Sequence, residues 1–525
     1  MARNHLFNGA RFIMLIRLKD SAHPLHRRLT EALKAAIRSG RLAAGGPLPS
    51  SRQLALDLQI SRNTVVAAYA QLAAEGYLHL RDRAAPNVVD KPGKSLPRRV
   101  DLLAEKPPGT AVTPQVFYPA LSSYATRLAQ VMDARSVASA SSVSRRGIRY
   151  DFQYGRPGVD EFPREIWRKL VSTHTRRASR DSLGYGDPAG LLQLRSAISK
   201  YLARARGMAV PPQQIIVVNG SQQGIDLAAR LLLDVGDTAL VEEPHYPGAT
   251  KVFEAQGARL LRVATDAHGL VTQLLPSAAV VKRTRLRMAY VTPCHQFPSG
   301  SILPLERRMA LLDWARQHQV WLLEDDYVSE FRYEGRPIEP LQALESQHNP
   351  GRAGQVIYIG TFSKTLFPSL RLGYLVVPPA LAPVFAAAKW AADRFASLLP
   401  QLALTEFIES GQFDLYLRRA SLRNARKRKA LLESLVEHFG DRVETAGGPS
   451  GVHLLVHFKA LSAKALDAEI TRAATAGVGV YSAASYYAAP QPHGILQLGY
   501  ASLTESEIRT GIRKLAQVML ATAPG

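Results

Sequence analysis

The first 90 residues alternate between apolar positions at helical spacing and short breaks rich in glycine or polar residues. A helix is predicted over residues 24–39, with its apolar positions on one face: Leu25, Leu29, Leu33, Ala36 and Ile37. Glycine and proline residues at positions 40 and 45–47 end this helix. A short helix over residues 48–58 follows, capped by Ser50 or Ser51, and a third helix begins at Ser61. Two short helices joined by a tight turn predict a helix-turn-helix.

Polar residues stand at the start of both helices of this pair, where a helix-turn-helix touches base edges and phosphates. The candidate DNA contacts are Ser50, Ser51, Arg52, Ser61, Arg62, Asn63 and Thr64, with Arg81 in a two-stranded wing predicted over residues 77–89. The segment LPSSRQLALDLQISRNTVVAAYAQLAAEGYL (48–78) resembles the winged helix of the GntR regulators, and the resemblance implies binding to double-stranded operator DNA. The wing reads RDRAAPN at 81–87, whereas that family turns there through glycines, so its contact with the minor groove stays open.

Residues 91–149 have the composition of a linker. Proline, glycine, serine, alanine and basic residues dominate this segment, which favours an extended tether. A short helix around residues 124–132 is compatible with the pattern. We therefore predict a DNA-binding domain at residues 1–90, a flexible basic linker at 91–149 and a second domain at 150–525.

From Tyr150 onward, short apolar runs alternate with helical stretches. Strands are predicted at 215–218, 239–241, 288–291, 320–323 and 356–359, and the helices include 225–233 and 305–318. This alternation predicts an α/β fold, with a mostly parallel sheet covered by helices on both faces. A smaller α+β unit follows toward the C-terminus. Ligands of such folds lie at the carboxyl ends of the strands, where polar clusters follow these runs.

Composition narrows the class of protein. The formal net charge is +23, and the first 150 residues carry +14 of it, which suits a polyanionic partner. No apolar run approaches the roughly 18 residues that span a bilayer. The single cysteine, Cys294, fits a reducing compartment, so a cytoplasmic protein is expected. The 14 histidines show no paired spacing typical of metal ligands, and no P-loop motif is present.

The segment GTFSKTLFPSLRLGY (360–374) follows a predicted strand and can hold a phosphorylated aldehyde. Lys364 can form a Schiff base, while Thr361, Ser363 and Arg371 can bind a phosphate. Ser221 and Gln222, after Gly220 at a helix start, offer backbone N–H groups to the same phosphate. Three further clusters fit pyridoxal 5′-phosphate (PLP): Tyr246 to stack on a pyridine ring, a carboxylate within residues 324–326 for its nitrogen, and Tyr327 for its O3′.

Residues 150–525 resemble a fold-type I PLP-dependent aminotransferase of class I. Together with the winged helix, the whole chain is similar to the MocR subgroup of GntR regulators. The resemblance implies that Lys364 is the Schiff-base lysine, that Asp325 pairs with the pyridine nitrogen, and that Tyr327 contacts O3′; Glu324 is a register alternative for Asp325. It also implies a homodimer, because Tyr185 matches a tyrosine that reaches the partner subunit's phosphate.

Two departures from the aminotransferase pattern bear on activity. Phe297 stands directly before Pro298, where the class I motif commonly has an asparagine, so His295 or Gln296 must take its place. Gln497 stands near the point where aminotransferases place an arginine for the substrate carboxylate, and a neutral amide supplies no such charge. Either another arginine serves, with Arg156 as a candidate, or the effector is not an ordinary α-amino acid.

These observations predict a PLP-dependent transcriptional regulator whose aminotransferase-like domain senses PLP, or an external aldimine of PLP with a small amine or amino acid. The main alternative is a working aminotransferase with an accessory DNA-binding domain, since Lys364 is intact. Physiological turnover is not expected, although a residual half-reaction is compatible with the residues. A third hypothesis is a DNA-binding protein with a cofactor-free structural domain.

Overall fold

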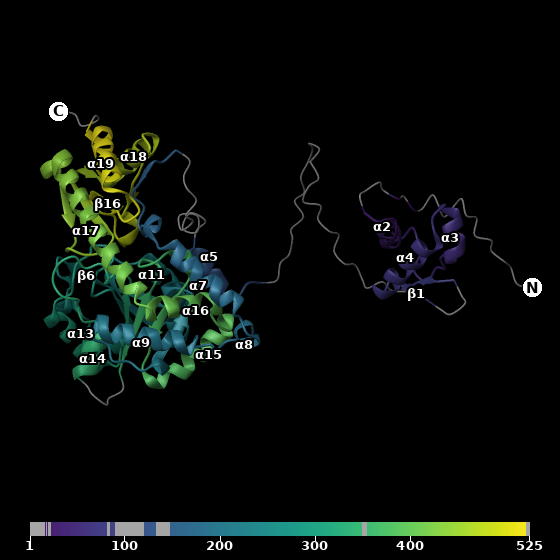
Figure 1. The fold of residues 1–525 in the computed structure, drawn as a ribbon, viewed down its shortest axis with the longest axis horizontal. Coiled ribbons are helices and arrows are strands. Elements are labelled where there is room, and N and C mark those ends of the chain that lie inside the picture. Colours follow the sequence, from purple (N-terminus) through teal and green to yellow (C-terminus); the bar gives the residue numbers. More distant parts are fainter. Residues whose placement is uncertain are drawn as a thin grey trace, which may run out of the picture. The chain divides into compact units, whose positions relative to one another are not determined.

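The structure is a computed structural model of the chain, and it describes residues 16, 18, 23–80, 85–89, 120–132, 147–348 and 354–520. Contacts between residues divide the chain into two compact units, residues 1–117 and residues 118–525. In Figure 1 the small unit is purple, and the large unit runs from blue to yellow. No helix within the described ranges combines the length and apolarity needed to cross a membrane.

The described part of the small unit consists of helices and a two-stranded ribbon: α2 (Leu25–Arg38), α3 (Ser51–Asp57), α4 (Arg62–Ala74), β1 (Leu78–His79) and β2 (Asn87–Val88). The predicted apolar face of α2 is its buried face, because Leu29 and Leu33 are fully covered and pack with Val65 and Leu72 of α4. The strands β1 and β2 pair antiparallel where the wing is predicted. The winged helix-turn-helix fold is thereby confirmed.

The large unit is built on an eight-stranded sheet, whose strands in spatial order are β4 (Ile215–Val218), β11 (Gly373–Val376), β10 (Val356–Thr361), β9 (Trp321–Asp326), β8 (Leu286–Val291), β5 (Thr238–Glu243), β6 (Arg259–Asp266) and β7 (Gly269–Leu270). Neighbouring strands from β10 to β6 are parallel, and β11 and β7 run antiparallel to their neighbours. The predicted mostly parallel sheet is confirmed. The sequence pattern does not mark β6, because its residues are largely exposed and form no apolar run.

Side chains of the buried strands alternate between two apolar clusters, one on each face of the sheet, and even the edge strand β4 follows this pattern. In β4, Ile215 and Val217 pack in the cluster of α9 (Leu192–Arg206) and α16 (Leu398–Glu409). Ile216 and Val218 pack in the cluster of α10 (Ser221–Leu232), α11 (Pro247–Gln256) and α15 (Ala382–Asp393). Burial on both faces explains why these strands read as continuous apolar runs. The remaining helices of this part are α7 (Arg164–Arg176), α8 (Arg180–Leu183), α12 (Ala278–Thr284), α13 (Leu305–His318) and α14 (Leu341–His348).

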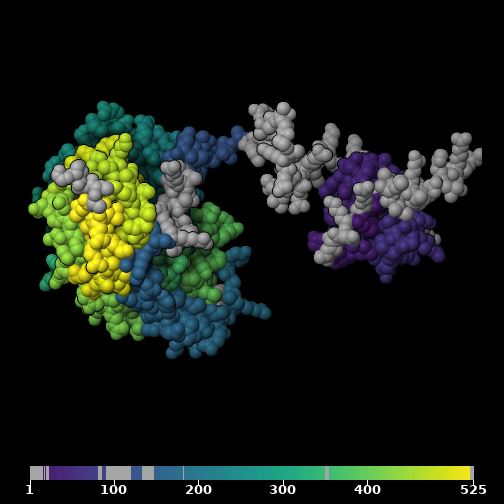
Figure 2. All heavy atoms as spheres, turned by 90° about the horizontal axis from the view of Figure 1, so that it is seen from above, coloured from purple at the N-terminus to yellow at the C-terminus, as the bar shows by residue number. Residues whose placement is uncertain are grey.

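The C-terminal part of the large unit is a smaller α+β layer. Its elements are α17 (Gln412–Phe439), β12 (Val443–Ala446), β13 (His453–Ser462), α18 (Ala463–Thr475), β14 (Val478–Gly479), β15 (Tyr481–Ser482), β16 (His493–Gly499) and α19 (Glu505–Leu520). An antiparallel sheet in the order β12-β13-β16-β15 forms its centre, and β14 pairs with β3 (Tyr150–Asp151). The helices α17 and α19 lie side by side, yellow-green and yellow in Figure 2.

One helix, α5 (Ser123–Val131), lies within the range predicted as a linker. It packs against α11, and the Arg127 guanidinium donates hydrogen bonds to the carbonyl oxygens of Ala255 (2.9 Å) and Gln256 (3.4 Å). These carbonyls end α11, where a cation is favoured by the helix dipole. Apart from residues 120–132 and 147–149, the predicted linker lies outside the described residues.

Candidate ligand pocket and nucleic-acid interface

The predicted pocket residues follow strands that lie near one another in the large sheet. Lys364 comes after β10, and Asp325 is the penultimate residue of β9, with Tyr327 directly after that strand. Ser221 and Gln222 begin α10, shortly after β4. The next residues along the chain after β5 lead to Tyr246. Because β5, β8, β9 and β10 are parallel, these polar segments come together at their carboxyl ends.

Lys364 has an amine adapted to nucleophilic chemistry. Its Nζ lies 3.4 Å from the Gly155 carbonyl oxygen and 4.8 Å from the centre of the Tyr154 ring. Burial lowers the pKa of this amine to about 8, and the Asp325 carboxylate opposes that shift. At neutral pH roughly a tenth of the amine is therefore unprotonated, against about one part in three thousand for an ordinary lysine.

Asp325 and Tyr327 each present a buried oxygen that has no hydrogen-bond partner among the described residues. Asp325 Oδ2 accepts a hydrogen bond of 2.7 Å from the Tyr290 hydroxyl, whereas Asp325 Oδ1 and the Tyr327 hydroxyl have none. Burial raises the pKa of Asp325 to about 7, and the hydrogen bond from Tyr290 counteracts part of that shift. Buried polar atoms are rarely left unpaired, so these two oxygens are suited to hydrogen bonds with a polar ligand.

Glu324, the register alternative, faces a different neighbour. Its carboxylate accepts hydrogen bonds from the backbone N–H groups of Leu341 (2.8 Å) and Gln342 (3.1 Å), at the start of α14. Successive residues of a strand point to opposite faces, so Glu324 and Asp325 cannot serve the same pocket. Asp325 is the residue on the side of Lys364.

An anion cradle lies at the start of α10. Gly220 has a φ of +84°, and a Cβ at this position would lie 2.9 Å from Arg371 Nη1, so only glycine lets the guanidinium approach. Arg371 itself has a φ of +53° and donates to the Asn219 carbonyl oxygen. A left-handed non-glycine residue beside a helix N-terminus is a strained position typical of ligand sites.

The other predicted phosphate ligands lie around this cradle. Ser221 and Gln222 are the first two residues of α10, so their backbone N–H groups have no partner within the helix. Thr361 is buried at the end of β10, and its hydroxyl accepts a hydrogen bond of 3.2 Å from the backbone N–H of Ser363. Together with Arg371, these groups form a site with the chemistry of a phosphate cradle.

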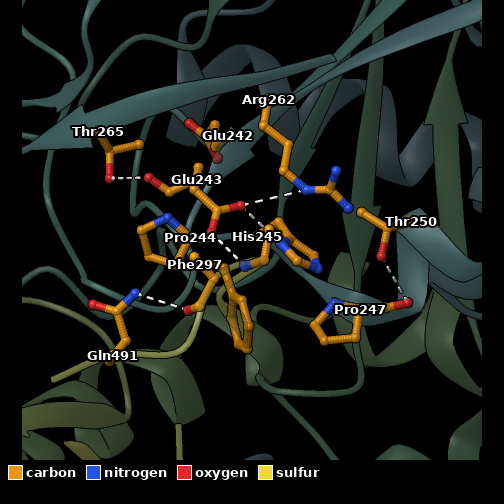
Figure 3. A network of polar contacts seen from close by, with 12 residues as sticks. Glu242, Glu243, Pro244, His245, Pro247, Thr250, Arg262, Thr265, Phe297 and Gln491 are labelled. Carbon is orange, nitrogen blue, oxygen red and sulfur yellow. Dashed lines mark hydrogen bonds and ion pairs between the residues drawn. The ribbon is translucent and has the colours of Figure 1, made fainter. Parts of the chain in front are cut away.

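The segment after β5 holds Tyr246 at the N-terminus of α11. The Tyr246 hydroxyl lies 3.5 Å from Gln222 Oε1, and its ring meets Phe297 edge-on at 5.2 Å. Figure 3 shows how the preceding residues are fixed: Glu243 Oε2 lies 3.3 Å from His245 Nδ1 and 3.6 Å from Arg262 Nε. These contacts hold the loop that presents the Tyr246 ring.

Four rings form what we call the aromatic wall of the pocket: Tyr154, Phe297, His453 and Tyr486. The Phe297 ring is its centre, with ring centres 5.3 Å from Tyr154, 6.0 Å from His453 and 5.0 Å from Tyr486. The Tyr154 ring joins the wall to Lys364. None of these rings except Phe297 stands out in the sequence, because they come from segments far apart in the chain. The sequence did not predict a role for Tyr290 either, because its partner Asp325 lies on another strand. The position of Tyr290 in a strand that precedes a polar cluster is the one sequence feature that could have indicated it.

The residues at the two departures from the aminotransferase pattern, near Phe297 and at Gln497, form hydrogen bonds within the chain. His295 Nδ1 lies 3.0 Å from Ser450 Oγ, and Gln296 Nε2 donates to the Pro244 carbonyl oxygen at 2.9 Å. Gln497, on β16, accepts a hydrogen bond of 2.6 Å from the Tyr486 hydroxyl.

Arg156 and Tyr185 each contact a partner other than the residues around Lys364 named above. Arg156 Nη1 forms an ion pair of 2.9 Å with Asp151. Tyr185 is 90% exposed, and its ring packs edge-on against Phe395 at 6.1 Å. Among the predicted cofactor residues, Tyr185 and Arg371 are exposed on the single chain.

The predicted DNA contacts lie at the starts of α3 and α4. Ser50 caps α3 by accepting a hydrogen bond from the Gln53 N–H (3.2 Å), and Ser61 caps α4 by accepting one from the Thr64 N–H (3.1 Å). Ser51 is the first helical residue of α3. The side chains of Arg52, Arg62 and Asn63 are exposed, and Thr64 is half-buried. Arg81 lies outside the described residues.

Comparisons with known families match both units. Residues 25–88 match the family of bacterial regulatory proteins of the gntR family, and residues 158–515 match aminotransferase class I and II. The chain is similar to the α-aminoadipate aminotransferase LysN of Thermus thermophilus, complexed with N-(5′-phosphopyridoxyl)-L-leucine, with 28% identity and a TM-score of 0.68 over 76% of this chain and 97% of LysN.

Full-length relatives share both units. The probable rhizopine catabolism regulatory protein MocR of Rhizobium meliloti is 36% identical over 97% of this chain and 96% of the relative. The pyridoxine biosynthesis transcriptional regulator PdxR of Corynebacterium glutamicum is 30% identical over 94% of this chain and 95% of the relative. The chain therefore belongs to the MocR-type transcriptional regulators, which join a GntR helix-turn-helix to an aminotransferase-like domain.

Proposed function

We propose that the large unit binds PLP and that its occupancy controls the binding of the small unit to operator DNA. The observation that carries this proposal is the pair of unpartnered buried oxygens, Asp325 Oδ1 and the Tyr327 hydroxyl, beside Lys364. A protonated pyridine nitrogen satisfies the first and the phenolic oxygen of PLP satisfies the second. When bound, PLP supplies an aldehyde that joins reversibly to amines.

The residues of this chain then have separate tasks. Lys364 holds the aldehyde, while Arg371, Ser221, Gln222, Thr361 and Ser363 hold the phosphate. Asp325, oriented by Tyr290, keeps the ring nitrogen protonated, and the Tyr246 ring stacks on the pyridine. The printed name of the relative PdxR, a regulator of pyridoxine biosynthesis, supports a link between this architecture and the vitamin.

The proposal extends to the signal and the assembly. Either PLP alone or PLP together with a small amine or amino acid alters DNA binding, which is a coupling between distinct sites. The protein acts in the cytoplasm as a homodimer. The exposed Tyr185 supports the dimer, because a tyrosine 90% exposed on one chain is free to complete the pocket of a second copy. The domain limits at residues 90 and 149 belong to the same proposal.

A second candidate function is transamination, favoured by the lowered pKa of Lys364 beside Asp325. Steady turnover of an amino acid at about 1 per second or faster would make the enzyme the primary function. We expect turnover well below that rate, measured by release of the keto acid with PLP-loaded protein.

The experiment that tests the proposal is an absorbance spectrum of the purified protein with PLP. We expect the visible band of lysine-bound PLP in the wild type and its loss in Lys364→Ala. The exposed Lys282 on α12 provides the matched control, and Lys282→Ala should keep the band. DNA fragments selected from a random pool by the wild type then report whether PLP changes operator affinity. A wild type without the band, or with equal operator affinity in both states, would contradict the proposal.

A further inference from the structure

The strands β13 and β16, beside the aromatic wall, hold two more buried atoms that lack a hydrogen-bond partner among the described residues. They are His453 Nδ1 and Gln497 Nε2, on side chains that are 2% and 1% exposed. PLP, as assigned above, satisfies Asp325 and Tyr327 and leaves these two unpaired. A polar ligand group or a water molecule must therefore meet them, because unpaired polar atoms in a buried site are costly.

The two side chains lie on adjacent strands and on the same face of the sheet. In the register of β13 and β16, His453 stands opposite Gly499 and Leu455 stands opposite Gln497. His453 and Gln497 are thus diagonal neighbours on the same face of the sheet, with Cβ atoms roughly 7 Å apart. Two hydrogen bonds of about 2.8 Å span up to about 5.6 Å, somewhat less than the Cβ separation, so one oxygen atom can reach both side chains where their ends converge.

The hydrogen-bonding role of each atom follows from its other partner. His453 Nε2 lies 2.9 Å from the Pro298 carbonyl oxygen, which can only accept, so Nε2 carries the proton. Burial lowers the pKa of His453 to about 4, so the ring is neutral and Nδ1 is an acceptor. Gln497 Oε1 accepts from the Tyr486 hydroxyl, and therefore the free Nε2 is a donor.

One acceptor beside one donor matches a hydroxyl group, which donates and accepts through the same oxygen. A carboxylate fits poorly, because it only accepts and would face the lone pair of His453 Nδ1. The nearby cation Arg156 is paired with Asp151, whose other oxygen accepts from Tyr481. A methyl group would leave both atoms unpaired.

This position faces the lysine. The Tyr154 ring lies 4.8 Å from Lys364 Nζ and 4.8 Å from the His453 ring, and the charge of Lys364 is among the groups that act on His453. On the basis of the proposed function, we propose that the effector is an amine that carries a hydroxyl group, held between His453 Nδ1 and Gln497 Nε2, rather than an amine that carries a carboxylate there.

The test compares matched amines on the full-length, PLP-loaded protein by isothermal titration calorimetry. Ethanolamine, propanolamine and butanolamine vary the distance between amine and hydroxyl. Each is compared with the alkylamine that has methyl in place of hydroxyl, and with the amino acid of the same chain length: glycine, β-alanine or γ-aminobutyrate. We expect at least one amino alcohol to bind about tenfold or more tightly than both of its analogues, because a site built for a hydroxyl rejects ligands that lack it.

Two substitutions sharpen the comparison. Gln497→Glu keeps the shape but replaces the donor by an acceptor, so it should weaken the hydroxyl preference, and His453→Phe should do the same by removing the acceptor. Gln497→Arg should shift the preference toward the amino acids. The visible PLP band, retained in all three variants, reports a folded and loaded pocket.

Two results would overturn the inference. Equal affinity for an amino alcohol and its alkylamine would mean that the two atoms hold a water molecule only. Tighter binding of the amino acids by the wild type would mean a carboxylate site. Absence of the PLP band in the wild type would instead contradict the proposed function, so the two failures are distinguishable.

Discussion

The two units place their functional residues in opposite environments. At the starts of α3 and α4, Arg52, Arg62 and Asn63 are exposed, and the capping serines already have partners. In the large unit, Asp325, Tyr327, His453 and Gln497 are buried and each keeps an atom without a partner in the described chain. The capping hydroxyls of the small unit are hydrogen-bonded within the chain, whereas the polar atoms of the large unit need a ligand to pair with. The stability of the small unit should therefore depend little on DNA, and the stability of the large unit should increase when its ligand binds.

The largest effect is expected from Asp325→Asn. A neutral amide cannot balance the positive charge of a protonated pyridine nitrogen. We therefore expect PLP affinity to fall by about 30- to 100-fold, or roughly 2–3 kcal/mol. The PLP-free protein should lose no stability, since the substitution removes a buried charge. Absorbance titration and thermal unfolding measure the two effects. As control, Tyr358→Phe removes a hydroxyl that donates to the neighbouring Asp326 at 2.7 Å, and it should leave PLP affinity within a few-fold.

The same carboxylate makes the stability of the PLP-free large unit depend on pH. Burial raises the pKa of Asp325 from 3.8 to about 7. Between these values the folded state binds the proton more tightly than the unfolded state, so this group makes stability fall as pH rises. Asp325→Asn should flatten that fall by on the order of 1 kcal/mol or more between about pH 4 and pH 7. Urea unfolding of wild type and variant at both ends of this window measures it, and parallel curves would refute the assignment.

Arg62→Ala tests the exposed surface. We expect operator affinity to fall by about tenfold, because an exposed guanidinium at the start of a recognition helix binds phosphate or a base edge. The PLP band should be unchanged. Fluorescence anisotropy with selected DNA measures the affinity, and Arg164→Ala on the large unit serves as the matched arginine control. Loss of PLP binding in Arg62→Ala would show that the pocket depends on the small unit.

The smallest expected effect concerns the helix caps. Ser61→Ala removes the hydroxyl that accepts from the Thr64 N–H, and should destabilise the small unit by about 1 kcal/mol. Ser51→Ala changes a residue inside the first turn of α3, where Ser50 is the cap, and should cost little. Urea unfolding followed by circular dichroism compares the two. Equal losses would mean that the cap assignment is wrong.

The contrast between the units also explains how far the sequence could be interpreted. The helix-turn-helix depends on neighbours in the chain: Ser61 and the Thr64 N–H are three residues apart, and the apolar face of α2 repeats every three or four residues. Even so, the pattern left Ser50 and Ser51 as alternatives, which the hydrogen bond to Gln53 distinguishes. Lys364 and Arg371 could be predicted as cofactor contacts from the sequence because both lie in the segment 360–374.

The rest of the pocket depends on packing between distant elements. Tyr154, Tyr290 and His453 come from three segments and gain their roles only when β8, β13 and the residues after β3 meet. No local spacing in the sequence predicts contacts between these distant segments. The same holds for α5: its composition is typical of a tether, and its place against α11 depends on an arginine reaching carbonyls more than a hundred residues away.

The lone cysteine has a practical consequence for spectroscopy. Cys294 is buried, and burial raises the pKa of its thiol to about 12, so the reactive thiolate is scarce at neutral pH. A cysteine introduced on the surface would therefore react with a dye far faster than the native one. Donor and acceptor fluorophores on α4 and α5 could then follow the separation of the two units in solution, with an essentially unlabelled background, as PLP and amines are added.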